Sequence, residues 1–141
     1  GGLYTWHEAM QWQHEEGLQG VCPEGWHLPS KMEWQALDKF LGIEESGQKM
    51  KVTSTHDPSW DGNNESGFTA IPSGVGYEKY FGRLGDWAVY WSSSGKNEDY
   101  AWYSQLDNFW YPVPPKYKIL YIGNFFVKEN GFSVRCVKDR E

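Results

Sequence analysis

The sequence predicts an α+β domain in which helices come first and antiparallel strands follow. Two early segments each carry a capping box followed by apolar residues at helical spacing. After Gly42 the pattern changes to short segments bounded by Gly, Pro, Asn and Ser, which is typical of strands joined by turns. The 141 residues fit one domain, and no internal repeat or linker divides them.

The first predicted helix begins after Thr5 and ends near Gly17. The Thr5 hydroxyl can accept a hydrogen bond from the Glu8 amide while the Glu8 carboxylate reaches back to the Thr5 amide. Apolar residues at helical spacing follow, and they include Ala9 and Met10. His7 and His14 lie seven positions apart (14 − 7) on this predicted helix, too far for both to bind one metal ion.

The second predicted helix begins after Ser30, which forms the same capping box with Glu33. Trp34 and Leu37 share one face, and Gly42 stands where a left-handed residue commonly ends a helix. The turn between the two helices contains His27, which we interpret as structural. The predicted strands are residues 50–53, 68–71, 88–91, 100–106, 117–122 and 132–137.

The composition excludes several classes of partner. A formal net charge of -6 argues against nucleic acid, which requires a basic surface, and against binding to anionic lipid. No apolar run approaches the length of a membrane span, so direct membrane insertion is not expected. Nine Trp and nine Tyr exceed what a small core requires, and we expect some of these rings to lie on a binding surface.

Two long irregular segments, residues 55–67 and 107–118, are the candidate binding loops. Trp6, Trp26, Trp34 and Trp91 are expected in the core. Trp102 and Tyr103 are neighbours in one strand, so only one of them can face the core. The candidate ligand-binding residues are aromatic rings with nearby polar side chains: Trp60, Trp102, Tyr103, Asp107, Asn108, Trp110, Tyr111 and Tyr117.

Catalytic and metal sites have weaker support. The four histidines lack the neighbours of a nucleophilic or metal-dependent enzyme, so we do not predict an enzyme. Asp57, Asp61, Asn63 and Glu65 offer oxygen ligands for Ca²⁺, but their spacing is not that of an EF-hand. A solvated turn is the favoured interpretation of this loop, and calcium is the alternative. No other cofactor is predicted.

Cys22 and Cys136 are the two cysteines of the chain. Their spacing alone leaves open either a disulfide or two buried thiols.

Several segments resemble the signature of the Fibrobacter succinogenes major paralogous domain. They occur in order through nearly the whole chain: residues 2–6 (GLYTW), 22–30 (CPEGWHLPS), 66–74 (SGFTAIPSG), 90–94 (YWSSS) and 131–139 (GFSVRCVKD). This family is similar in pattern to C-type-lectin-like domains and to the domain of formylglycine-generating enzymes. The resemblance implies two helices packed on a small twisted antiparallel sheet, with a long loop region above it.

The resemblance also implies a disulfide between Cys22 and Cys136 and a secreted or surface-anchored bacterial protein. Family members usually carry another strand before the opening helix, and this chain starts after it, so the single domain of residues 1–141 is expected to lack that strand. The segment 107–127 is longer and more aromatic than the corresponding family loop.

These observations predict a non-catalytic extracellular module that binds polysaccharide or a surface glycan through loop aromatics. The alternative is a protein-interaction or structural surface module that uses the same loop face. Calcium-bridged sugar binding is a third possibility. Because fold does not determine function, the choice rests partly on the resemblance.

Overall fold

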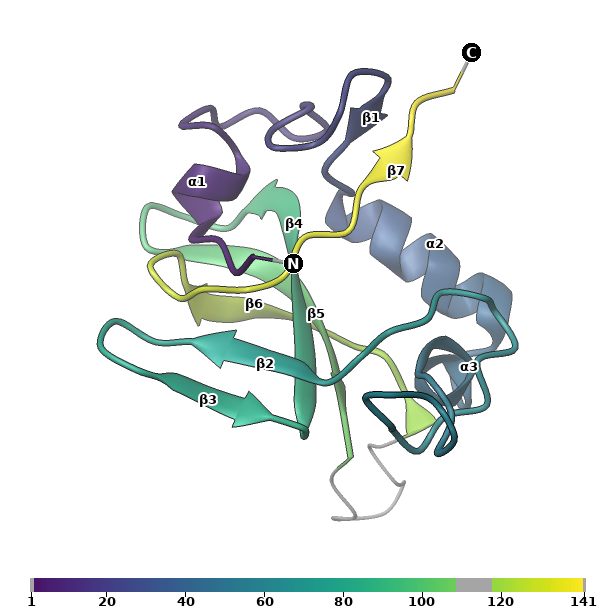
Figure 1. Cartoon of the computed structure of the whole chain (residues 1–141). Helices are drawn as coiled ribbons and strands as arrows, with labels where there is room; N and C mark the ends of the chain where they lie inside the picture. Colours follow the sequence, from purple (N-terminus) through teal and green to yellow (C-terminus); the bar gives the residue numbers. More distant parts are fainter. Residues whose placement is uncertain (1, 109–117, 141) are drawn as a thin grey trace.

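The computed structural model describes residues 2–108 and 118–140 (Figure 1). The helices are α1 (Trp6–Ala9), α2 (Lys31–Leu41) and α3 (Ser46–Met50). The strands are β1 (Trp26–His27), β2 (Ser73–Gly76), β3 (Phe81–Leu84), β4 (Trp87–Gly95), β5 (Tyr100–Asp107), β6 (Tyr121–Val127) and β7 (Val137–Lys138). The chain is therefore α+β, with more sheet than helix, and the expected pair of helices is corrected to three short ones in the described residues.

Within the described ranges, five strands form one curled sheet in the order β3-β2-β4-β5-β6 (Figure 1). Neighbouring strands are antiparallel except β2 and β4, which are parallel, so the expectation of a fully antiparallel sheet is wrong at that pair. A separate ribbon pairs β1 with β7, which brings the early turn beside the end of the chain.

Buried side chains pack against both faces of the sheet. Because side chains alternate along a strand, Val89 and Trp91 of β4 pack with Trp6 of α1 on one face. Ala88 of β4 packs with Trp34 of α2 on the opposite face. Trp6, Trp34 and Trp91 are buried as expected, whereas Trp26 is 39% exposed on the β1–β7 ribbon. The Trp26 ring is therefore partly open to solvent, and its expected place in the core is wrong.

The first helix is much shorter than its apolar spacing predicts. Its capping box between Thr5 and Glu8 forms, but the chain leaves the helix at Met10. Gln11 and Trp12 have φ angles of 54° and 59°, which an α-helix does not allow. The chain then turns back, so the rings of the two nearby histidines, His7 and His14, lie 6.2 Å apart.

The second helix follows its prediction closely. Ser30 and Glu33 form the reciprocal capping box, and Gly42, with a φ of 92°, ends the helix. Helix α3 carries no side-chain cap and includes Gly47, which explains why no sequence signal predicted it.

The strand predictions were confirmed at β4 and β5 and were shifted or wrong elsewhere. β6 begins at Tyr121 rather than at residue 117, and the predicted strands 50–53 and 68–71 form only an isolated parallel bridge between Lys51 and Ala70. Residues 132–137 make isolated bridges before β7 begins at Val137. Strands β2 and β3 were missed because their glycines mask the strand pattern.

The Cys22–Cys136 disulfide is present and confirms the pairing that the resemblance implies. It joins the turn before β1 to the segment before β7, with the two Cα atoms 5.8 Å apart. No helix in the described residues is long and apolar enough to cross a membrane.

Candidate functional site: an aromatic groove on the sheet

A groove of about 310 Å³ lies on the face of the sheet formed by β4, β5 and β6. We call it the aromatic groove. Its volume lies at the small end of the range for ligand pockets. Tyr121 and Phe125 are 40% and 55% exposed, so both rings are accessible. The lining residues are Trp87, Tyr103, Gln105, Asp107, Tyr121, Phe125 and Phe126.

The strand register explains why these residues meet. Tyr103, Gln105 and Asp107 alternate along β5 and therefore project to one face. Asp107 is paired with Trp87 of β4, and Gln105 is paired with Tyr121 of β6. The groove consequently has a polar floor from β5 and an aromatic wall on each side.

An irregular register and one glycine shape the end of the groove. The pairing of β5 with β6 shifts between Ala101 and Tyr103, a change that locally re-aims side chains in a strand. The rings of Phe125 and Phe126 both come within 6 Å of the Tyr103 ring, at 5.9 and 4.6 Å between centroids. A Cβ atom at Gly123 would lie 2.5 Å from the Tyr103 hydroxyl, so glycine is needed to leave room for that ring.

The polar groups of the groove are held in place by hydrogen bonds. The Gln105 amide donates to the Asp107 carboxylate at 3.1 Å, and the Tyr103 hydroxyl is hydrogen-bonded to that of Tyr121. Burial, together with Tyr121, raises the pKa of Tyr103, so its phenol remains neutral at physiological pH. The groove thus presents fixed hydrogen-bonding groups beside exposed rings.

A buried lysine supports the groove from behind. Lys51 is fully buried, pairs with Asp61 at 2.7 Å and donates to the backbone carbonyl of Asp107 at 2.9 Å. Its ammonium lies 5.1 Å from the centroid of the Trp60 ring. Burial lowers the pKa of Lys51, although the negative charge of Asp61 opposes that change.

Of the proposed ligand-binding residues that the structure describes, Tyr103 and Asp107 line the groove. Asn108 lies next to it and contacts Asp86 at 3.5 Å. Trp102 points to the opposite face, where the Lys31 ammonium lies 4.6 Å from its ring centroid.

Trp60 is 6% exposed and belongs to the core, so it offers no ring to a ligand. Trp110, Tyr111 and Tyr117 lie outside the described residues.

The sequence reasoning missed Trp87, Gln105, Tyr121, Phe125 and Phe126. Alternation along β5 could have found Gln105 beside Tyr103 and Asp107. The β6 residues were missed because that strand was placed too early in the chain.

The candidate calcium ligands do not converge. Asp61 is engaged by Lys51, while Asn63 and Glu65 bond to each other through a local turn. In the described part of the chain, no group of three or more His, Cys, Asp or Glu side chains is placed to hold a metal ion. Asp57 therefore belongs to no such group.

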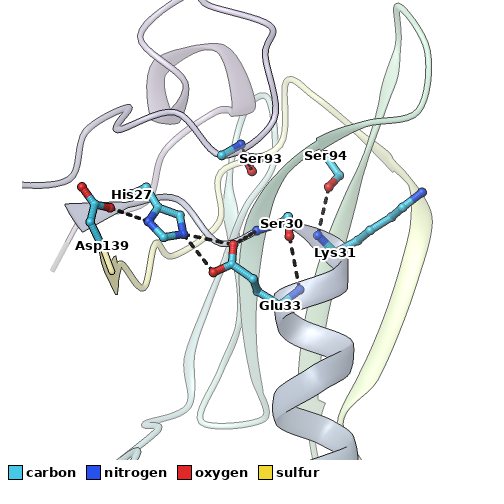
Figure 2. Close-up of polar contacts among 8 residues, drawn as sticks. His27, Ser30, Lys31, Glu33, Ser93, Ser94 and Asp139 are labelled. Carbon is cyan, nitrogen blue, oxygen red and sulfur yellow. Dashed lines mark hydrogen bonds and ion pairs between the residues drawn. The ribbon is translucent and has the colours of Figure 1, made fainter. Parts of the chain in front are cut away.

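A second polar cluster centres on His27 and joins three distant segments (Figure 2). The Nδ1 atom of His27 lies 2.7 Å from the Asp139 carboxylate, and Nε2 lies 2.9 Å from that of Glu33. Burial by itself would lower the pKa of His27, but these two carboxylates outweigh it and raise the pKa. The Ser30 hydroxyl accepts from the Glu33 amide as the cap of α2, so it serves the helix end. This His–carboxylate cluster therefore fastens β1, α2 and the C-terminal segment together.

The run of three serines, residues 92–94, is a second fastening point. The Ser94 hydroxyl accepts from the Lys31 amide at 2.9 Å (Figure 2). The same hydroxyl donates to the Glu16 carboxylate at 2.7 Å. The Ser93 hydroxyl accepts from the Gly17 amide at 2.9 Å. Buried hydroxyls in β4 thus accept hydrogen bonds from backbone amides at the start of α2 and in the loop that precedes β1.

A model of the Fibrobacter succinogenes major domain matches residues 1–138, nearly the whole chain. The chain belongs to this family. No curated protein and no solved structure matches it. The motifs that carry the resemblance contain both cysteines of the disulfide, His27, Asp139 and the three serines. The residues that line the aromatic groove lie outside those motifs.

Proposed function

We propose that this Fibrobacter major domain is a non-catalytic extracellular module that binds polysaccharide in the aromatic groove. The observation that carries the proposal is the pairing of exposed rings, Tyr121 and Phe125, with the oriented Gln105–Asp107 pair. Flat rings pack against the apolar faces of sugars, and fixed polar groups beside them select hydroxyl positions. The proposed binding surface is the sheet face, extended by Asn108.

Two further features support an extracellular, non-catalytic role. Structural disulfides persist in oxidising compartments, which favours secretion or display at the cell surface. The His27 cluster sets a histidine between two carboxylates, and the neighbouring serine, Ser30, serves as a helix cap. We also propose that the chain has a C-type-lectin-like fold, on the basis of the early helices, the curled sheet and a disulfide between the turn before β1 and the segment before β7.

The test is binding to a panel of soluble plant and host polysaccharides, by affinity electrophoresis and calorimetry, with and without EDTA. Phe125→Ala and Gln105→Ala are the groove variants, and Phe81→Ala is the matched control because that ring is 82% exposed on β3 outside the groove. Loss of a buried aromatic contact is expected to weaken binding roughly tenfold or more. EDTA is expected to have no effect.

A protein-binding role is the second candidate, and one observation favours it. Tyr80, Phe81 and Leu84 are 64%, 82% and 82% exposed at the edge strand β3, and exposed apolar clusters mark protein interfaces. The same variants distinguish the two functions. Absence of binding to every polysaccharide by a folded protein would contradict the glycan proposal and favour this surface. Equal polysaccharide binding by wild type and Phe125→Ala would contradict the groove as the binding site.

A further inference from the structure

A second cavity, of about 330 Å³, lies near the disulfide and shares no lining residue with the aromatic groove. Its walls come from the N-terminal segment, the segment before β2, β4 and the segment before β7. Apolar side chains such as Tyr4 and Ile71 line one part of the cavity. Arg135, Tyr90, Ser73 and Ser133 supply polar groups to the remainder.

Arg135 is held in one orientation at this cavity. Its Nη2 atom donates to the Phe68 carbonyl at 2.9 Å, and the guanidinium carbon lies 4.1 Å from the centroid of the Phe68 ring. The Tyr90 hydroxyl is also hydrogen-bonded to the guanidinium. A guanidinium fixed in this way pays little conformational entropy when it binds a further group.

The positive charge of Arg135 is not compensated locally. Across residues 2–108 and 118–140, no carboxylate forms an ion pair with this guanidinium. Tyr90 cannot supply the negative charge, because burial raises its pKa to about 12. A partly buried charge without a counter-charge is energetically costly. The planar N–H groups of the guanidinium match the two oxygens of a carboxylate.

Two hydroxyls in the lining of the same cavity add a hydrogen-bond donor. The Oγ atoms of Ser73 and Ser133 lie 3.1 Å apart, so one hydroxyl can donate to the other. That arrangement leaves the hydrogen of the second hydroxyl available to an acceptor in the cavity.

We propose that this cavity binds an organic monocarboxylate with a compact apolar body. Arg135 pairs with the carboxylate, the Ser73–Ser133 pair donates to it, and the side chains of Tyr4 and Ile71 pack against the body. A doubly charged phosphate is disfavoured, because one guanidinium meets it in a chain of net charge -6. This site is independent of the proposed glycan groove.

The test is a titration of the isotope-labelled protein with benzoate, followed by amide and arginine side-chain NMR signals. Benzamide has the same shape without the charge, and glucuronate has the charge without the apolar body. Saturable shifts at residues 133–136 are expected with benzoate. For a charge-assisted pair, the affinity for either control ligand should be lower by roughly tenfold or more. Arg135→Gln should abolish the saturation, whereas Arg140→Gln, at an exposed arginine, should preserve it.

Three outcomes would overturn the proposal: no saturation up to high millimolar benzoate, equal affinity for benzamide or glucuronate, or shifts centred elsewhere. The comparison of the three ligands uses the wild-type protein, so it decides the question even if Arg135→Gln does not fold. Neither a positive nor a negative benzoate result requires any change in polysaccharide binding. The test of this cavity is therefore separate from the test of the aromatic groove.

Discussion

The Nδ1 atom of His27 lies 2.7 Å from a carboxylate oxygen of Asp139, although 112 residues separate them in sequence. The contact closes the β1–β7 ribbon beside the disulfide, and the opposite ring nitrogen binds Glu33 at the start of α2. A titratable side chain of β1 therefore links the C-terminal segment to the second helix.

Stability should depend on pH through this link. The pKa of His27 is raised above 6.5, so its stabilising contribution is fully present below that pH and is lost as pH rises through the folded-state pKa. Burial would raise the pKa of Glu33, but its hydrogen bonds lower it below 4.5, so its contribution is present above that pH and lost in stronger acid. The two contributions overlap between pH 4.5 and 6.5.

His27→Gln is accordingly expected to lower the free energy of unfolding by about 1 kcal/mol in that window and by less at alkaline pH. The magnitude is small because the Asp139 side chain is half exposed. Urea unfolding at several pH values measures the difference. His56→Gln is the control, since its ring contacts the Pro58 carbonyl in an exposed loop. A pH-independent cost for His27→Gln would contradict the linkage.

The disulfide should contribute strongly to stability. It closes a sequence separation of 114 residues, and a loop of that size corresponds to about 4–5 kcal/mol in the chain-entropy account. Replacing Cys22 and Cys136 together by serine should lower the free energy of unfolding by that amount. Reductant should destabilise the wild type similarly and leave the double variant unchanged. Wild-type protein that is insensitive to reductant would refute this expectation.

The two partners of the buried ion pair should respond unequally to substitution. Lys51 is fully buried, whereas the Asp61 side chain is 34% exposed. Asp61→Ala removes the carboxylate that pairs with this buried ammonium, and it is expected to lower the free energy of unfolding by about 3–5 kcal/mol. Lys51→Met should cost less, because water can reach the remaining carboxylate. Glu45→Ala, at the exposed Glu45–Lys49 pair, is the control and should cost under about 1 kcal/mol. Equal losses of unfolding free energy for Asp61→Ala and Lys51→Met would contradict this argument, because desolvation of the remaining charge would then not decide which substitution costs more.

Gly123 should be intolerant of even a methyl group. A Cβ atom there would lie 2.5 Å from the Tyr103 hydroxyl and 2.8 Å from the Tyr121 ring. Gly123→Ala is therefore expected to destabilise the protein by about 1–3 kcal/mol and to weaken polysaccharide binding by displacing both rings. Asn124→Ala, at the adjacent position, should change stability by no more than about 0.5 kcal/mol. Unchanged binding by Gly123→Ala would remove Tyr103 and Tyr121 from the proposed site.

Local signals predicted the parts of the fold that local chemistry controls. The capping boxes at Thr5 and Ser30 act over three residues, and Gly42 ends α2 through its own backbone freedom. The turn-forming residues that bound the segment 100–106 were sufficient to place β5. The family motifs supplied the disulfide, because cysteine spacing alone could not.

Other features depend on contacts between distant residues. The Gly-rich β2–β3 hairpin has weak strand propensity, and pairing with β4 and the bridge from Gly76 to Gly131 hold it in the sheet. Trp60 sits in a turn-rich loop that predicts exposure, yet Lys51 and the core on the α2 side of the sheet enclose its ring. Burial of that kind is a property of the assembled molecule.

The sequence by itself determined the α+β class, the starts of two helices, the paired cysteines and the family. Tertiary structure alone decided which aromatic rings face solvent and which polar groups stand beside them. The groove exists because the register of β4, β5 and β6 places Trp87 beside Asp107 and Tyr121 beside Gln105. Strand register is set by pairing across the whole sheet, and a shift of one residue would turn these side chains to the opposite face.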